Sequence, residues 1–87
     1  MRIREMENIL NTANGLLRDP QANAAALKDF QPRIKALEEY YMSSLWKEDL
    51  AADEAGKLPK DLKRGVLSED GVYDMLSLNK ETMESLG

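Results

Sequence analysis

Apolar residues recur at alternating three- and four-residue intervals along the first half of the chain. The first such set is Ile3, Met6, Leu10, Ala13 and Leu17. Successive residues of an α-helix are rotated by about 100°, so this spacing places the whole set on one face of a helix. The pattern predicts an N-terminal amphipathic helix with its apolar face in the core.

A second set with the same spacing follows. It consists of Leu27, Phe30, Ile34, Leu37 and Tyr41. Asp19 and Pro20 lie between the two sets. Aspartate can accept backbone N–H groups as an N-cap, and proline suits the first position of a helix. Two helices joined by about two residues predict an antiparallel helical hairpin.

Pro32 lies inside the second helical pattern. Proline has no backbone N–H, and its ring collides with the carbonyl of the residue four positions earlier, here Lys28. We therefore expect a kink at Pro32 or a break into two helices.

Two serines, Ser43 and Ser44, follow the second pattern. Either hydroxyl can cap a new helix that spans residues 45–55, with Gly56 just past its end. Because serine is only mildly unfavourable inside a helix, the second helix can instead continue through both serines. The sequence leaves these two alternatives open.

A turn and a capped helix are predicted for the C-terminal part of the chain. Leu58 and Pro59 open a short turn or a single helical turn, which Gly65 closes. Ser68 is the expected N-cap of the last helix, because two acidic residues follow it and favour the positive end of the helix dipole. The inner face of this helix is expected to consist of Val72, Met75, Leu76, Met83 and Leu86.

These elements predict an all-α fold of three to four helices, in which the N-terminal antiparallel hairpin packs against the C-terminal helix. We expect a single domain over residues 1–87, because the chain is shorter than most protein domains. So small a core stabilises a fold by only about a few kcal/mol. Burial against a partner, including a second copy in a homo-oligomer, would add to this stability.

The composition is that of a folded soluble protein, with 43% hydrophobic and 32% charged residues. No apolar run is long enough to span a membrane, and the first residues contain no apolar signal-peptide core. Cysteine is absent, which excludes disulfides and fits a reducing compartment. We therefore expect a cytoplasmic protein with no membrane partner.

The formal net charge of −4 lies in the second half of the chain. Residues 1–44 carry six basic and six acidic side chains, whereas residues 45–87 carry six and ten. A pI of about 4.8 argues against direct nucleic-acid binding, which calls for a basic face. The sequence has one local basic stretch, which is typical of a solvated surface. It consists of Lys57, Lys60, Lys63 and Arg64.

Carboxylates are the main groups that could support chemistry in this chain. Without histidine and cysteine, the common catalytic triads and zinc sites cannot be built. Asp49 and Asp53 are four residues apart and share a helical face, and Glu69 and Asp70 open the last helix. Together they could hold Mg²⁺ or Ca²⁺. A solvated face and helix capping explain the same residues, so we expect no metal, cofactor or catalytic residue.

Four of the five aromatic residues lie between residues 40 and 73. Tyr41 continues the apolar pattern of the second helix, so we expect the adjacent Tyr40 to be more peripheral. Trp46 and Tyr73 either close a small second core or form a partner surface, since tryptophan, tyrosine and arginine are common interface anchors. The candidate interface residues, including a polar rim, are Tyr40, Trp46, Asp49, Arg64, Glu69 and Tyr73.

Residues 40–76 also carry an extended signature, YYxSxxWxxD followed by DEAGxLPxDLKRGVLSEDxVYDxL. This signature resembles a family of small bacterial proteins described only as a domain of unknown function. A weaker similarity extends through the N-terminal RIxxMExIL stretch. The resemblance implies a small cytoplasmic protein of bacterial or phage origin, and it implies no activity.

We expect the protein to be a small non-catalytic adaptor or regulator that binds another protein. One alternative is an acidic inhibitor that mimics nucleic acid toward a nucleic-acid-binding protein, which the acidic second half would favour. Another is a metal-dependent enzyme that uses the four carboxylates named above.

Overall fold

Four α-helices and one 3-10 turn form the described part of the chain. A computed structural model describes residues 2–86, apart from the side chain of Glu69. The elements are α1 (Arg2–Leu17), α2 (Ala24–Tyr41), α3 (Ser44–Glu54), the 3-10 turn η1 (Gly65–Leu67) and α4 (Glu69–Leu86). The predicted all-α class is confirmed.

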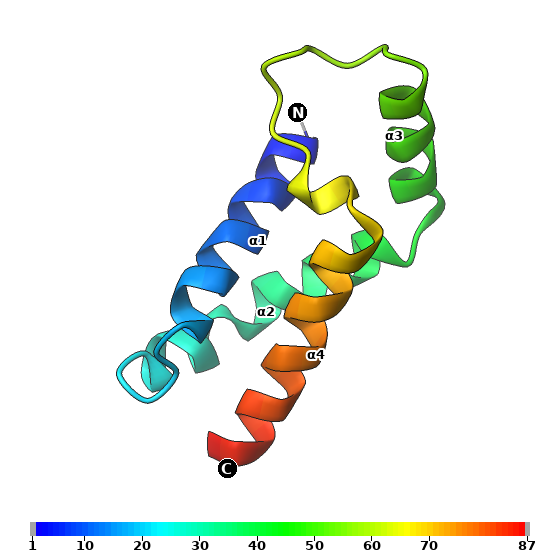
Figure 1. The fold of residues 1–87 in the computed structure, drawn as a ribbon. Helices are drawn as coiled ribbons and strands as arrows, with labels where there is room; N and C mark the ends of the chain where they lie inside the picture. Colours follow the sequence, from blue (N-terminus) through cyan, green and yellow to red (C-terminus); the bar gives the residue numbers. More distant parts are fainter. Residues whose placement is uncertain (1, 87) are drawn as a thin grey trace.

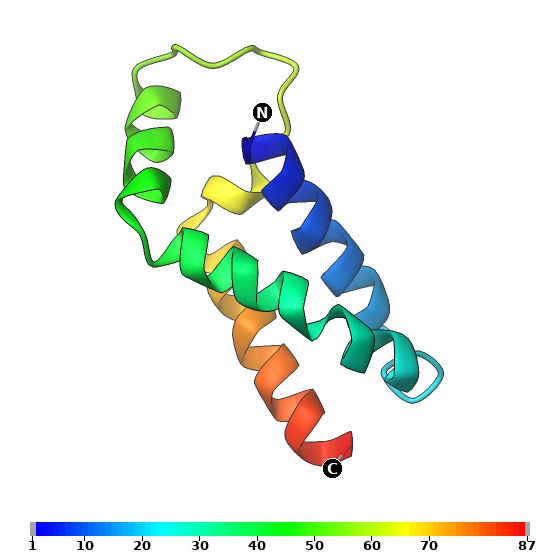
Figure 2. The ribbon, with the colours of Figure 1, turned by 180° about the vertical axis from the view of Figure 1, so that it is seen from behind.

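Helices α1 and α2 form the predicted antiparallel hairpin, and α4 packs against both of them (Figure 1). The shorter α3 lies at one end of the molecule, where it contacts α2 and η1. Seen from behind, a long connection arches from α3 back toward the start of α1 (Figure 2). The molecule is elongated, with extents of 43 × 23 × 19 Å.

The apolar faces predicted from the sequence make the core. On α1, Ile3, Leu10, Ala13 and Leu17 are buried and Met6 is partly buried. The faces of α2 and α4 meet them, with Leu27 and Leu37 fully enclosed on α2 and Val72 on α4. Residues from η1 and the preceding loop complete the core, namely Leu62, Val66 and Leu67.

The connection between α1 and α2 is longer than the sequence suggested. α2 begins at Ala24, and its N-cap position is Asn23. Asp19 does not cap α2. Its carboxylate accepts a hydrogen bond from the Ala22 N–H at 3.3 Å, and its carbonyl accepts one from the Asn23 N–H at 3.1 Å. Asp19 therefore stabilises a separate turn, since these local bonds compete with helix formation around Pro20.

α2 runs through Pro32 as one helix, so of the two alternatives predicted at Pro32 the break into two helices does not occur. A proline removes only its own N–H from the hydrogen-bond ladder, and the apolar residues on both sides of it are held in the same core. The residue directly before the proline, Gln31, donates its side-chain amide to the Leu27 carbonyl one turn earlier, at 2.9 Å.

At Ser43 and Ser44 the second helix does not continue, and a new helix begins, which is the first of the two alternatives that the sequence left open. Ser43 has extended backbone angles, and α3 starts at Ser44, one residue before the predicted position. Gly56 ends α3 with a positive φ of 71°. The Gly56 N–H donates to Asp53 and the Lys57 N–H donates to Ala52, which is the Schellman arrangement of a helix end.

The predicted start of α4 is confirmed. The Ser68 hydroxyl accepts a hydrogen bond from the Gly71 N–H at 3.3 Å, as an N-cap residue does. Before it, the Leu62 N–H donates to the Pro59 carbonyl in a turn, and Gly65 opens the 3-10 turn rather than closing a helical one.

Candidate functional site

Many residues of the signature join distant parts of the chain inside the fold. Asp49 on α3 is buried and receives three hydrogen bonds. The Arg2 guanidinium donates to its two oxygens at 2.8 and 2.9 Å, and the Tyr40 hydroxyl donates at 2.6 Å. This group of Arg2, Tyr40 and Asp49, here called the Asp49 cluster, ties α1, α2 and α3 together. It is the first of the polar contacts between distant elements that we call joints.

The electrostatics of the Asp49 cluster follow from its geometry. Burial acts to raise the pKa of Asp49, but the hydrogen bonds from Arg2 and Tyr40 and the positive charge of Arg2 outweigh burial and lower it. Burial and the Asp49 carboxylate raise the pKa of Tyr40 well above its ordinary value. The hydrogen bond to Asp49 also raises the pKa of Arg2. The cluster is therefore held as a carboxylate, a guanidinium and a neutral phenol.

A second joint holds η1 against α1 and α3. The indole N–H of Trp46 donates to the Val66 carbonyl at 2.9 Å. The Val66 N–H donates in turn to the Glu7 carboxylate at 2.8 Å. Glu7 is a buried acid on the apolar face of α1, and it satisfies a backbone donor that would otherwise lie unpaired in the core.

A third joint closes the loop of residues 55–64. Arg64 forms an ion pair with Asp53 at the end of α3, and its guanidinium also donates to the Pro59 carbonyl at 2.9 Å. Both ends of the loop are thereby fixed on the same side of the molecule.

The structure separates the residues that the sequence suggested as an interface. Trp46 and Asp49 are buried in the joints, and Arg64 is half-buried against Asp53. The side chain of Glu69 lies outside the described residues. Among the members whose side chains the structure describes, Tyr73 is the exposed one, with 61% of its surface accessible.

One expectation about the aromatic residues was wrong. Tyr40 is buried and not peripheral, because its hydroxyl reaches the Asp49 carboxylate, whereas Tyr41 is only partly buried. Tyr41 packs edge-on against Trp46, with ring centroids 5.0 Å apart. The core interpretation fits Trp46 but not Tyr73, which faces outward.

The two carboxylates of α3 that the metal hypothesis required are each occupied by an arginine: Asp49 by Arg2, and Asp53 by Arg64. Within the described part of the chain, no three acidic, histidine or cysteine side chains are grouped so that they could hold a metal ion.

An open groove of about 940 Å³ lies between α2 and α4. Its apolar lining includes Ile34, Tyr41, Met42, Tyr73, Leu76 and Met83. Its charged lining consists of Lys35 and Glu38 on α2 and Lys80 and Glu84 on α4. We call this the α2–α4 groove.

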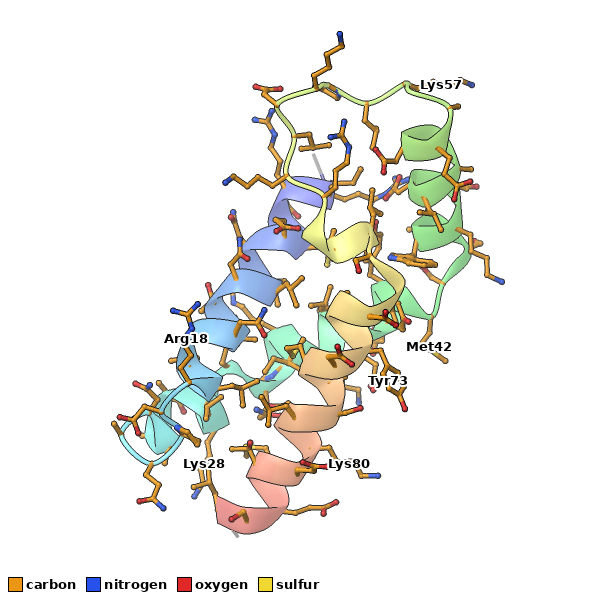
Figure 3. The ribbon with its side chains drawn as sticks, in the orientation of Figure 1. Arg18, Lys28, Met42, Lys57, Tyr73 and Lys80 are labelled. Atoms are coloured by element: carbon orange, nitrogen blue, oxygen red, sulfur yellow. The ribbon has the colours of Figure 1, made fainter. Side chains whose placement is uncertain are left out.

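One end of the groove exposes large apolar side chains. Met42 is 77% exposed, and Figure 3 places it beside Tyr73. Farther along, the amides of Gln31 and Asn79 exchange two hydrogen bonds of 3.0 Å and fix α2 against α4.

Sequence reasoning identified Tyr73 but missed the groove. The apolar arc of α4 is wide, since Leu76 and Met83 lie beside the fully buried stripe, and such width is a usable signal of a second contact surface. Met42 gives no such signal, because it follows the end of α2 and belongs to no periodic pattern.

Among the described residues, no helix combines the length and the apolarity needed to cross a membrane. Fold and contacts together define a small helical module whose signature residues serve as internal joints. The chain belongs to the family described as Domain of unknown function (DUF4298), whose sequence model matches residues 3–86. No curated protein and no solved structure matched the chain.

Proposed function

We propose that this protein is a small non-catalytic adaptor or regulator that binds another protein through the α2–α4 groove. The observation that carries the proposal is the exposed apolar lining of the groove. A small monomer has little apolar surface to spare, and a contiguous apolar patch with a polar rim is typical of an interaction site.

The side chains at the open end of the groove support this choice. Tyr73 and Met42 are 61% and 77% exposed, and tyrosine and methionine are enriched in the cores of protein interfaces. The groove also has a rigid base, because the paired amides of Gln31 and Asn79 hold its two walls together. A preformed site loses less conformational entropy on binding.

The internal joints favour binding over chemistry. Asp49 and Asp53, the acids with the best spacing for a shared task, are each neutralised by an arginine. We place the protein in the bacterial cytoplasm, which is in keeping with the resemblance to small bacterial proteins and with a chain that lacks cysteine.

Affinity capture from a bacterial lysate tests the proposal when groove and control variants are compared. The groove variant is Met42→Ser/Tyr73→Ser. The matched control is Leu45→Ser/Leu78→Ser, which also removes two exposed apolar side chains, 43% and 46% accessible, that do not line the groove. All four side chains are exposed, so both variants should fold, and circular dichroism checks this.

We expect the wild type and the control to recover the same protein in near-stoichiometric amounts, and the groove variant to lose it. Recovery should survive added salt, because the contact is mainly apolar. An acidic mimic of nucleic acid would instead lose its partner steeply as salt rises. Equal recovery by all three baits, or no specific protein, would contradict the proposal.

A further inference from the structure

The charged residues on the walls of the α2–α4 groove follow a fixed order. α2 and α4 run antiparallel across it, since Gln31 pairs with Asn79 while Met42, at the far end of α2, lies beside Tyr73 near the start of α4. Positions along the two walls can therefore be ordered from residue numbers, at about 1.5 Å per residue.

The order is acid, base, base, acid. Lys80 lies level with the Gln31–Asn79 pair, and Glu84 lies about one turn beyond it, on the side away from Tyr73. In the other direction, Lys35 lies about one turn nearer to Met42, and Glu38 follows it by about one further turn. All four side chains are exposed. Among the residues that the structure describes, none of the four forms an ion pair within the chain.

The shape of the groove selects a convex occupant. Two copies of this chain that faced each other through this groove would enclose two hollows of about 940 Å³, whereas the cores of stable interfaces are packed as densely as protein interiors. One α-helix, about 10 Å across with its side chains, can lie between two helices and fill the space. The wall formed by residues 31–42 matches about three turns of such a helix.

We propose that the occupant of the α2–α4 groove is an amphipathic helix of a partner protein, with acidic residues flanking the middle of its apolar stripe and basic residues toward both ends. The acids face Lys35 and Lys80, and the bases face Glu38 and Glu84. The apolar stripe covers Tyr73, Leu76 and Met83. This inference rests on the proposed function, because it names the class of partner for the same groove.

Two synthetic peptides of identical composition test the inference. Each is an alanine-rich helix with leucines at helical spacing on one face. The first carries two glutamates at its middle and one lysine toward each end, and the second exchanges these positions. Each peptide has the same charge at both ends, so interactions with the helix dipole are favourable at one end and unfavourable at the other in both peptides. Fluorescence anisotropy measures binding to the full chain.

We expect the first peptide, with glutamates at its middle (acid-centred), to bind about tenfold more tightly at low salt than the second, with lysines at its middle (base-centred). The reason is that the first forms four exposed ion pairs with the groove, whereas the second meets four repulsions. The preference should fall in high salt. The quadruple variant Lys35→Glu/Glu38→Lys/Lys80→Glu/Glu84→Lys keeps the net charge, and it should prefer the base-centred peptide. The variant Leu76→Ser/Tyr73→Ser should weaken both peptides.

Equal binding of the two peptides, no binding of either, or a preference that the quadruple variant leaves unchanged would overturn the inference. Groove-dependent dimerisation in sedimentation equilibrium would also overturn it, by assigning the groove to a second copy. If lysate capture still recovers a groove-dependent protein while the peptides fail, the proposed function stands and only the partner class is wrong.

Discussion

The indole N–H of Trp46 donates to the Val66 carbonyl at 2.9 Å across 20 residues of sequence, and both residues are buried. Val66 is held on its other side by Glu7, so a single residue of η1 links α1 to α3. A short 3-10 turn has few hydrogen bonds of its own, and these side chains fix its place in the core.

Replacing Trp46 by phenylalanine should therefore destabilise the protein by about 1–3 kcal/mol or more, because the Val66 carbonyl would be left buried without its donor. Urea unfolding followed by circular dichroism measures this without relying on tryptophan fluorescence. A benzothienyl analogue of tryptophan keeps the bicyclic size but lacks the N–H. If the analogue were as stable as the wild type, the hydrogen bond would not be the cause.

The Asp49 cluster predicts a loss of stability in acid. The pKa of Asp49 is lower in the folded protein than in the unfolded chain. The contribution of Asp49 to the free energy of unfolding is therefore complete above the unfolded pKa of about 4, and it is lost as pH falls through the folded pKa. Asp49→Asn should cost about 1–3 kcal/mol near neutral pH. Urea unfolding at several pH values should show this difference shrinking below about pH 4. A difference independent of pH would contradict the lowered pKa.

Tyr40 makes the complementary prediction in alkali. The pKa of Tyr40 is higher in the folded protein than in the unfolded chain. The contribution of Tyr40 to the free energy of unfolding is therefore complete below about pH 10 and declines as pH rises further. Tyr40→Phe should be less stable than the wild type by about 1–2 kcal/mol near neutral pH, and the two should converge in alkali. Tyr73→Phe, which alters an exposed phenol, is the control and should parallel the wild type. If both variants behaved alike, the Tyr40 hydroxyl would have no special role.

The sequence predicted those parts of the fold that depend on local chemistry. Helix faces followed from periodic apolar residues such as Leu10 and Leu37, and the start of α4 followed from the capping residue Ser68. The end of α3 followed from Gly56, because only glycine readily adopts its positive φ.

The parts that could not be predicted depend on contacts between distant residues. Glu7 reads as an interruption of an apolar face until Val66, 59 residues away, brings its N–H to it. Periodicity alone suits Tyr41 better than Tyr40 for burial. The outcome was decided by Asp49 on α3, which accepts a hydrogen bond from the Tyr40 hydroxyl and is itself held by Arg2 on α1. The groove depends on how α4 lies across α2, and no local pattern encodes that geometry.

Two glycines in helices should respond in opposite ways to the same substitution. A Cβ atom on Gly71, in the first turn of α4, would lie 2.9 Å from the Gly65 carbonyl oxygen, which belongs to the backbone of η1 and cannot move without disturbing Val66. A Cβ atom on Gly15 in α1 meets nothing within 4 Å.

Gly15→Ala should therefore stabilise the protein by about 0.5–1 kcal/mol, because alanine is the better helix former and the unfolded chain loses freedom. Gly71→Ala gains the same propensity, but it must push η1 away from α4, and overpacking of this kind costs about 1–3 kcal/mol. Thermal and urea unfolding of both variants measure the contrast. Because helix propensity acts equally at both positions, the difference between them isolates the close approach of η1 to α4. If Gly71→Ala were as stable as Gly15→Ala, the two backbones would not meet as the structure describes.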